Sequence, residues 1–483
     1  GALQSRAGRL RRLVEPVGIE ANLQGFTKLL EGEPAEFAAF RARWERPQLH
    51  CVFTAHPTFL LSPAQAAAVV AAASQEGEID ATVCAVPSER VEITLDFEHD
   101  CALAAIARAA DARDRLVAAL LDHASQRWPG EWHALEPLPF RFASWVGYDM
   151  DGRTDINWHD SIAFRLAEKA GRLERYVASL EAVDAAHPLL AALREAAAWS
   201  RERAEDFAVD LADPEALSAA ANRLTADHPG KLLSLTPLID ALEEEARDAE
   251  TRRAVALKTL AAAMRADGLG AGWIHFRVNA SQLHNAIRRV IDPDGELDLA
   301  SRGALVRLRE RLEAVMPHRS NFAALAIESS TAIRQFLAMA QILHHIDADA
   351  PIRMLIAECE QLSTILAALY FARLFGIEDK VDVSPLFETE SALEHGGRFL
   401  DALLAEEPYR AYVRKRGRVA IQTGFSDAGR FVGQVPASLA IERLQGRLAQ
   451  AMADNGLADV AALIFNTHGE SMGRGAHPDS FDD

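Results

Sequence analysis

The amino-acid sequence predicts an α/β fold that is mostly helical. Its centre is a (β/α)8-type barrel with seven of eight strands visible, surrounded by many additional α-helices. Two observations favour this class. Short apolar runs alternate with long amphipathic stretches, and polar or glycine-rich residues follow each run. Strands that alternate with helices indicate a parallel sheet, and this number of repeats favours a barrel over an open sheet.

Seven short apolar runs are predicted as strands because each has the length and the continuous apolar character of a strand buried on both faces. They are Leu49–Phe53, Phe140–Val146, Trp273–Phe276, Ile352–Ala357, Val381–Leu386, Arg418–Thr423 and Ala461–Phe465. A barrel of this class closes with eight strands. We therefore expect the eighth strand beyond Asp483 and interpret residues 1–483 as one domain that is incomplete at its C-terminus.

Between these runs, apolar residues recur every three or four positions with charged residues among them, as on an amphipathic helix. The predicted helices are Pro63–Gln75, Glu98–Gln126, Ser161–Val183, Pro188–Phe207, Pro214–Thr225, Pro237–Asp267, Leu305–Val315, Ala323–His345, Cys359–Phe375 and Ala437–Asn455.

The composition limits the partners. The 70 acidic and 51 basic residues give a formal charge of -19, which disfavours nucleic acid and anionic membranes. The chain shows neither a membrane-spanning apolar run nor a signal peptide. The four cysteines are scattered without CxxC spacing, which is typical of free thiols in a reducing compartment. We expect a cytoplasmic protein.

Two acidic residues directly follow predicted strands. Glu388 ends the run that starts at Val381, and Asp427 ends the run that starts at Ala420. Carboxylates at the C-terminal ends of successive barrel strands converge on one mouth, where they can hold Mg²⁺ or Mn²⁺. The alternative is that both acids are N-caps or first-turn acids of the helices that follow.

A histidine and an arginine also stand at strand ends. His56 lies at the mouth of the first predicted strand, and Arg277 follows Trp273–Phe276. A guanidinium there can clamp a phosphate or a carboxylate through two parallel hydrogen bonds. The alternatives are a hydrogen-bonded structural histidine and a surface arginine paired with an acid.

Five motifs occur in a fixed order along the chain. They are Thr54-Ala55-His56-Pro57-Thr58, Phe276-Arg277, Pro385-Leu386-Phe387-Glu388-Thr389, Gly424-Phe425-Ser426-Asp427, and Gly469-Glu470-Ser471-Met472-Gly473-Arg474-Gly475. Together they resemble those of the phosphoenolpyruvate carboxylase family of bacterial type, from about His56 to the end of the chain. The resemblance implies that His56, Arg277 and Arg430 act in catalysis. It also implies that Arg277, His468 and Arg474 bind the substrate, and that Glu388 and Asp427 hold Mg²⁺ or Mn²⁺.

Several positions depart from the family's motifs. Tyr148 replaces a glycine and Met150 an arginine in the second-strand segment. Arg430 stands in the position of a lysine, and Asn466 in that of a histidine. His468 replaces a substrate-binding arginine, so phosphate binding should be weaker at neutral pH and should depend on pH.

The resemblance implies a lyase that carboxylates phosphoenolpyruvate with bicarbonate. The products are oxaloacetate, which replenishes the tricarboxylic acid cycle, and phosphate. It also implies a homo-oligomer. Two other interpretations stay open. One is a catalytically impaired or non-enzymatic barrel homologue that acts as a sensor or partner subunit. The other is a metal-assisted lyase for an acidic substrate without a phosphate, served by His56, Glu388 and Asp427.

Overall fold

The computed structural model describes residues 19–53, 94–150, 155–208, 211, 213–424 and 432–467. The chain divides into two compact units. The first contains the described residues of Gly1–Phe140 and Ala241–Ala263, and the second contains those of Arg141–Asp240 and Met264–His468. Within the described ranges, no helix has the length and apolar character needed to cross a bilayer.

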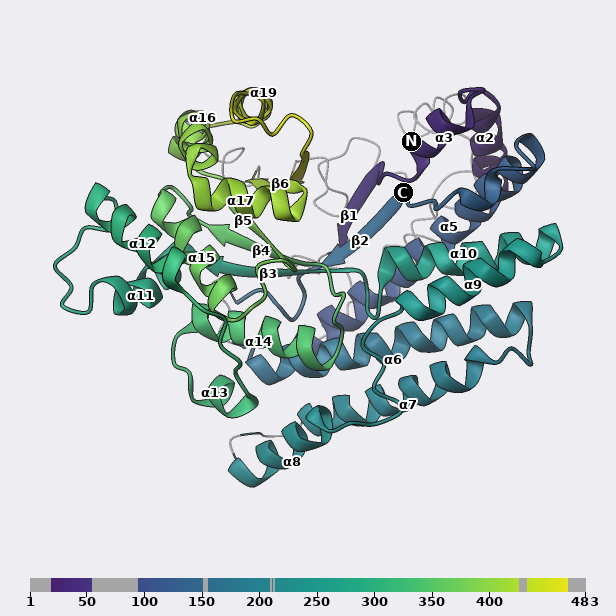
Figure 1. Ribbon diagram of the computed structural model, residues 1–483, viewed down its shortest axis with the longest axis horizontal. Coiled ribbons are helices and arrows are strands. Elements are labelled where there is room, and N and C mark those ends of the chain that lie inside the picture. The colour runs from purple at the N-terminus through teal and green to yellow at the C-terminus, as the bar shows by residue number, and fades with distance from the viewer. Residues whose placement is uncertain are drawn as a thin grey trace, which may run out of the picture. The chain divides into compact units, whose positions relative to one another are not determined.

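The structure confirms all seven predicted strands, and their order in the sheet follows their order in the chain (Figure 1). The strands are β1 (Leu49–Phe53), β2 (Phe140–Ser144), β3 (Trp273–Asn279), β4 (Ile352–Ala357), β5 (Val381–Phe387), β6 (Arg418–Gly424) and β7 (Ala461–Thr467). The pairings from β2 to β7 are all parallel. This curled, all-parallel sheet with its many helices confirms the predicted fold class. An eighth strand stays a prediction.

Most helices belong to the second unit. They are α6 (Trp158–Val183), α7 (Leu189–Phe207), α8 (Pro214–Thr225), α11 (Ala280–Ile291), α12 (Arg302–Ala314), α13 (Phe322–Ile327), α14 (Thr331–His345), α15 (Leu362–Leu374), α16 (Glu390–Ala405), α17 (Glu407–Arg416) and α19 (Gln434–Asp454). The prediction of one helix over Ala323–His345 was wrong. Glu328–Ser330 interrupts it, and the Ser330 hydroxyl caps α14 by accepting from the Ile333 N–H at 3.5 Å.

The first unit contains β1 beside the start of β2, with the Leu49 N–H donating to the Pro139 carbonyl at 3.2 Å. Its helices are α2 (Ile19–Glu31), α3 (Phe37–Trp44), α5 (Leu95–Arg127) and the 3-10 turn η2 (Trp132–Ala134). Two further helices, α9 (Thr236–Asp248) and α10 (Thr251–Asp267), cross the boundary between the units. The single helix predicted over Pro237–Asp267 was therefore wrong. The helix predicted over Pro63–Gln75 lies outside the described residues.

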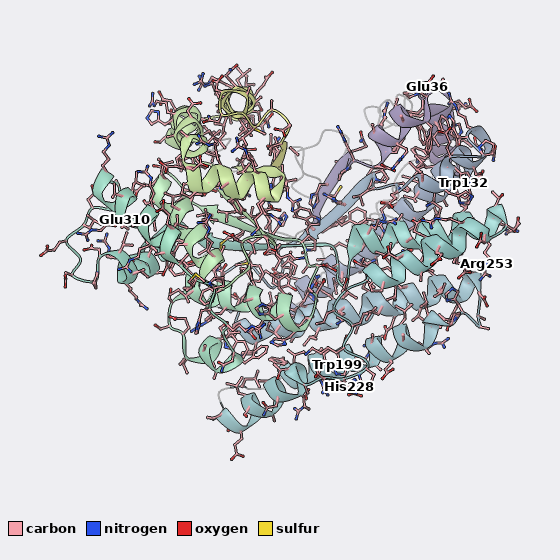
Figure 2. The ribbon with its side chains drawn as sticks, viewed as in Figure 1. Glu36, Trp132, Trp199, His228, Arg253 and Glu310 are labelled. Carbon is pink, nitrogen blue, oxygen red and sulfur yellow. The ribbon has the colours of Figure 1, made fainter. Side chains whose placement is uncertain are left out.

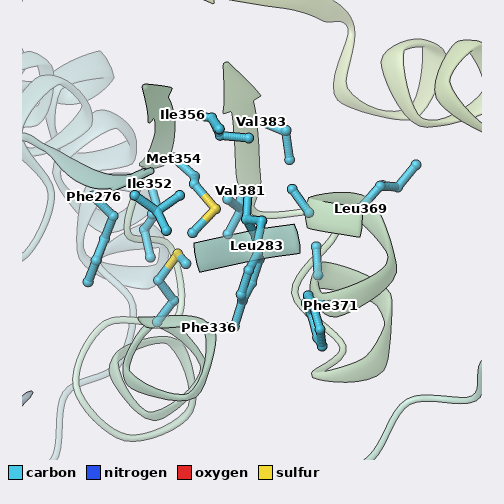
Figure 3. Close-up of a cluster of buried hydrophobic side chains, with 14 of the residues drawn as sticks. Phe276, Leu283, Phe336, Ile352, Met354, Ile356, Leu369, Phe371, Val381 and Val383 are labelled. Carbon is cyan, nitrogen blue, oxygen red and sulfur yellow. The ribbon is translucent and has the colours of Figure 1, made fainter. Parts of the chain in front are cut away.

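The core of the second unit lies between the outer face of the sheet and its covering helices (Figure 3). Alternate residues of each strand point outward, among them Phe276, Ile352 and Val381, and each is at most 1% exposed. Leu283 of α11, Phe336 of α14 and Phe371 of α15 pack against them, as expected for helices that cover a parallel sheet.

A buried ion network joins α6 to the segment after α14. The Arg165 guanidinium is fully buried and donates to Glu168 Oε2 at 2.9 Å and to Asp347 Oδ2 at 2.6 Å. Burial opposes its charge, but the two carboxylates outweigh burial and raise the pKa of Arg165. Gly270 makes room for it, because a Cβ at that position would lie 1.9 Å from the Arg165 NH1 atom.

A second charged cluster lies at the N-terminal ends of the strands. The Asp382 carboxylate, which is 1% exposed, accepts from Arg416 at 2.9 Å and from Arg418 at 2.9 Å. Arg353 is buried beside them and donates to the carbonyls of Ile421 at 3.3 Å and Leu463 at 2.6 Å. Burial lowers the pKa of Arg353 to about 10. In barrels of this kind, residues at this end of the strands serve stability.

Candidate active site

Arg277 lies near the C-terminal end of β3, and the loop after β2 holds its side chain. The Arg277 NH1 group donates to Asp149 Oδ2 at 3.1 Å, and its guanidinium carbon lies 5.5 Å from the centre of the Trp145 ring. The Gln335 side chain of α14 donates to the Arg277 carbonyl at 2.8 Å. The arginine is therefore paired with an acid, as the alternative interpretation expected. That acid, Asp149, lies in the second-strand segment between Tyr148 and Met150.

Tyr148 fixes the same loop through buried contacts. Its side chain is fully buried, its ring centre lies 5.2 Å from that of Phe276, and its hydroxyl donates to Glu168 Oε1 at 2.9 Å. The Arg277 N–H donates to the Tyr148 carbonyl at 3.4 Å. The tyrosine thus connects the loop that orients Arg277 to the Arg165–Glu168–Asp347 network.

Glu388 immediately follows β5 and precedes the N-cap of α16. The cap is Thr389, whose hydroxyl accepts from the Ala392 N–H at 3.0 Å, and the first-turn acid is Glu390. The structure therefore rules out the alternative interpretation of Glu388 as the helix cap. Its carboxylate remains at the end of the strand, where chemistry gathers in barrels.

The ends of β5 and β6 meet at Glu388 and Gly424. A Cβ on Gly424 would lie 2.5 Å from the Glu388 Cβ and 3.2 Å from its Cα, closer than atoms pack. Glycine at 424 therefore allows the backbone of Glu388 to approach the end of β6. Asp427 follows Gly424 by three residues.

Replacing Gly424 with alanine is expected to destabilise the protein by about 1–3 kcal/mol, because the new methyl group overpacks against Glu388. Urea unfolding would measure the cost. Gly446→Ala is the matched control: this glycine lies in α19 with nothing within 4 Å of its would-be Cβ. Alanine there should stabilise by about 0.5–1 kcal/mol. Equal effects of the two substitutions would contradict the close approach at Gly424.

The end of β4 adds features that sequence reasoning missed. Glu358 has a φ of 55°, the one positive φ recorded for a non-glycine residue in the described ranges. Nearby, the Thr389 hydroxyl donates to Glu360 Oε1 at 3.0 Å. Strained backbone clusters at functional sites, and a left-handed residue directly after a strand is invisible in the sequence. Asp149 lies between Tyr148 and Met150 of the second-strand segment, but its pairing with Arg277 had no sequence signal.

Five of the seven predicted site residues, His56, Asp427, Arg430, His468 and Arg474, lie outside the described ranges. The structure places only Arg277 and Glu388, both at the C-terminal ends of parallel strands.

Three substituted positions lie in the described ranges: Tyr148, whose contacts are given above, Met150 and Asn466. The Met150 side chain is 5% exposed, and the Asn466 Oδ1 atom accepts from the Thr423 hydroxyl at 3.0 Å. His284, in α11, shares a 2.7 Å hydrogen bond between its Nε2 atom and the Thr364 hydroxyl. This contact joins two covering helices.

The described side chains can be tested for their ability to bind a metal ion. Within the ranges that the structure describes, no group of three or more His, Cys, Asp or Glu side chains could hold one. Of the predicted carboxylate pair, only Glu388 is described. It follows β5 and lies close to the end of β6, because Gly424 has no Cβ to block the approach. Carboxylate oxygens are the donors that Mg²⁺ or Mn²⁺ takes, and Glu388 supplies one such group, whereas Asp427 lies outside the described ranges.

The sequence is similar to those of known proteins. The family model for phosphoenolpyruvate carboxylase matches residues 232–480. A phosphoenolpyruvate carboxylase of Xanthomonas campestris is 28% identical over 390 residues, 74% of this chain and 42% of the relative. Those of Roseiflexus castenholzii and Pseudomonas putida are 24% and 25% identical over 400 and 392 residues, covering 72% and 74% of this chain and 42% and 41% of the relatives.

The chain thus spans about two fifths of the length of these curated relatives. The matched region contains Arg277, the strands β3 to β7 and the segment around Glu388 and Gly424. Since the family model covers more than half of the 483 residues, the chain belongs to the phosphoenolpyruvate carboxylase family.

Proposed function

We propose that this protein carboxylates phosphoenolpyruvate with bicarbonate, giving oxaloacetate and phosphate. In this reaction a bicarbonate oxygen attacks the phosphorus, and the bond from phosphorus to the enol oxygen breaks. Carboxyphosphate then releases CO₂ and phosphate, and the enolate carbon attacks the CO₂. The observation that carries the proposal is Arg277, held by Asp149 and Trp145 at a strand end of a family barrel.

Arg277 would bind the phosphate. Its side chain is 21% exposed, and Asp149 fixes the orientation of its guanidinium. A preorganised guanidinium stabilises the negative charge that spreads over the phosphate oxygens as the phosphorus–oxygen bond breaks.

Glu388 and Asp427 would hold Mg²⁺ or Mn²⁺. When bound, such an ion supplies a positive charge that stabilises negative charge developing on oxygen. Thr389, and not Glu388, is the N-cap of α16, so Glu388 has no capping role in that helix. Gly424 supports the metal-binding role by bringing the start of the Asp427 segment to Glu388.

The remaining assignments follow the family motifs. His56 would accept a proton close to carboxyphosphate. Arg430 would supply the positive charge of the family's lysine, and His468 and Arg474 would contact the substrate phosphate.

A second candidate is a catalytically impaired relative that acts as a sensor or partner subunit. Two observations favour it. Met150, at an arginine position of the family, is buried, and Asn466, at a histidine position, is hydrogen-bonded to Thr423. Steady-state kinetics with Mg²⁺, bicarbonate and varied phosphoenolpyruvate, together with calorimetry of phosphoenolpyruvate binding, separates the two. Absence of both turnover and binding would exclude the carboxylase and favour the second candidate.

Replacing His468 with arginine is expected to increase the affinity for phosphoenolpyruvate about tenfold and to flatten the pH dependence of binding between about pH 6 and 8. A guanidinium keeps its charge over this range and grips two phosphate oxygens, whereas imidazole loses its charge. Calorimetric titrations at several pH values measure both effects. His395→Arg, in the helix α16, is the control and should change neither. An unchanged pH profile would show that His468 does not contact the phosphate.

A further inference from the structure

A pocket away from the strand ends collects basic side chains. It has a volume of about 620 Å³ and lies in the second unit between the segment after α8 and the end of α14. Its lining residues are Thr225, Asp227, His228, Pro229, Lys231, Leu233, His344 and His345. Lys231 and three histidines are basic, and Asp227 is acidic. With the histidines neutral, Lys231 and Asp227 balance each other, and protonation of a histidine makes the pocket positive.

The walls of this pocket are fixed. Lys169 reaches from α6 and donates to the Ile346 carbonyl at 2.9 Å and also to the Leu232 carbonyl. The Ala348 N–H donates to the Leu233 carbonyl at 2.9 Å. These bonds hold the two segments that carry the basic side chains, so the pocket exists before any ligand binds.

Several donors are available in the pocket. The His228 Nδ1 atom accepts from the Gly230 N–H at 2.9 Å, so the neutral ring carries its proton on Nε2. This ring stacks on Trp199 at 6.3 Å, and the two residues lie together in Figure 2. The His345 Nδ1 atom is buried with no hydrogen-bond partner in the described part of the chain. Lys231 forms no salt bridge there and donates only to the carbonyls of Thr225 at 3.0 Å and Ala226 at 3.4 Å.

We propose that this pocket binds a small dianion, a phosphate or a dicarboxylate, through Lys231, His228 and His345. Charge-assisted hydrogen bonds from an ammonium and two imidazoles match the oxygens of such a ligand. A cation does not fit, because no described group of His, Cys, Asp and Glu side chains here could hold a metal ion. The site is separate from Arg277 and does not depend on the proposed carboxylase reaction.

Sulfate is the probe of choice, and its binding to the full chain is measured by calorimetry. The measurement uses the Arg277→Gln background, in which the strand-end site no longer competes for the anion. Lys231→Met should weaken binding about tenfold or more, the usual effect of losing a charged hydrogen bond. His345→Phe keeps an aromatic ring against Phe322, 6.1 Å away, and should weaken binding similarly. Succinate and inorganic phosphate, titrated separately, identify which class of dianion binds more tightly.

Arg302→Met is the matched control, since this exposed arginine begins α12 and does not line the pocket. Circular dichroism confirms that each variant is folded. Unchanged sulfate binding in both folded pocket variants, or no binding to the unaltered pocket, would overturn the proposal. Absence of carboxylase activity in the unaltered protein, with sulfate still bound at this pocket, would count against the proposed function alone.

The pH dependence gives an independent readout. Burial, then Lys231 and His344, lower the pKa of His345 to about 4, and burial followed by Arg319 lowers the pKa of His344. Both rings are therefore neutral at pH 7. A bound dianion favours the imidazolium, so binding takes up protons and should tighten about threefold or more from pH 8 to pH 6.

Sulfate keeps both charges in this range, so the change belongs to the protein. Asp227 and Lys231 also face the site. Lys169 lies beneath it, and burial lowers the pKa of Lys169 to about 7. His345→Phe should therefore reduce the pH dependence without abolishing it. A pH profile that is the same with and without His345 would overturn its role as a ligand.

Discussion

Replacing Arg277 with glutamine is expected to lower kcat/KM for phosphoenolpyruvate by about 10²- to 10³-fold. A preorganised donor to developing negative charge contributes this much in other enzymes. The glutamine keeps a polar group near Asp149 but removes the charge and the fork of donors. Steady-state kinetics with saturating bicarbonate and Mg²⁺ measure the loss. Arg277→Lys, which keeps the charge and loses the planar fork, should recover only part of it.

The control for this substitution is Arg289→Gln. The Arg289 side chain is 62% exposed, and its NH1 atom lies 3.9 Å from Glu328 Oε1, which is too long for a strong ion pair. The change should therefore leave the kinetics unaltered. If Arg277→Gln and Arg289→Gln had the same kinetics, Arg277 would be a structural partner of Asp149 and not a substrate ligand.

Replacing Arg165 with methionine is expected to destabilise the second unit by about 3–5 kcal/mol. The substitution leaves the carboxylates of Glu168 and Asp347 buried without the cation that both contact. Methionine fills much of the arginine's volume, so the cost arises from charge and not from a cavity. Unfolding in urea, followed by fluorescence, gives the change in free energy.

Arg201→Met provides the same substitution on the surface. Arg201 pairs with Glu174, and the two side chains are 56% and 52% exposed, so its loss should cost less than about 1 kcal/mol. Similar costs for the two substitutions would mean that the buried network contributes no more than a solvated ion pair.

The sequence predicted the sheet well because strands buried on both faces leave a strong signal. Each of the seven runs is short and mostly apolar between polar segments. Helix boundaries were harder. Ala249 and Glu250 separate α9 from α10 without a glycine or a proline, so nothing in the pattern marked the break. No helix was predicted over α11, which begins directly after β3 at the N-cap Asn279.

Some features of the candidate site could also be predicted from the sequence, and others could not. Motif positions such as Arg277 and Glu388 could be found because their residue types and strand-end locations are readable from sequence. The contact of Arg277 with Asp149 could not, because 128 residues separate them and no spacing rule relates two loops of a sheet. The basic pocket was equally hidden, since His344 and Lys231 come together only when α14 packs near the segment after α8.

Gly270 limits which substitutions this sequence can accept during evolution. Since a Cβ at 270 would overlap the Arg165 guanidinium, any side chain there requires a shorter residue at 165. A shorter residue at 165 in turn leaves two acids to be replaced as well. The four positions 165, 168, 270 and 347 therefore form a covarying set. A homologue that changes one of them is expected to have changed the others in the same lineage.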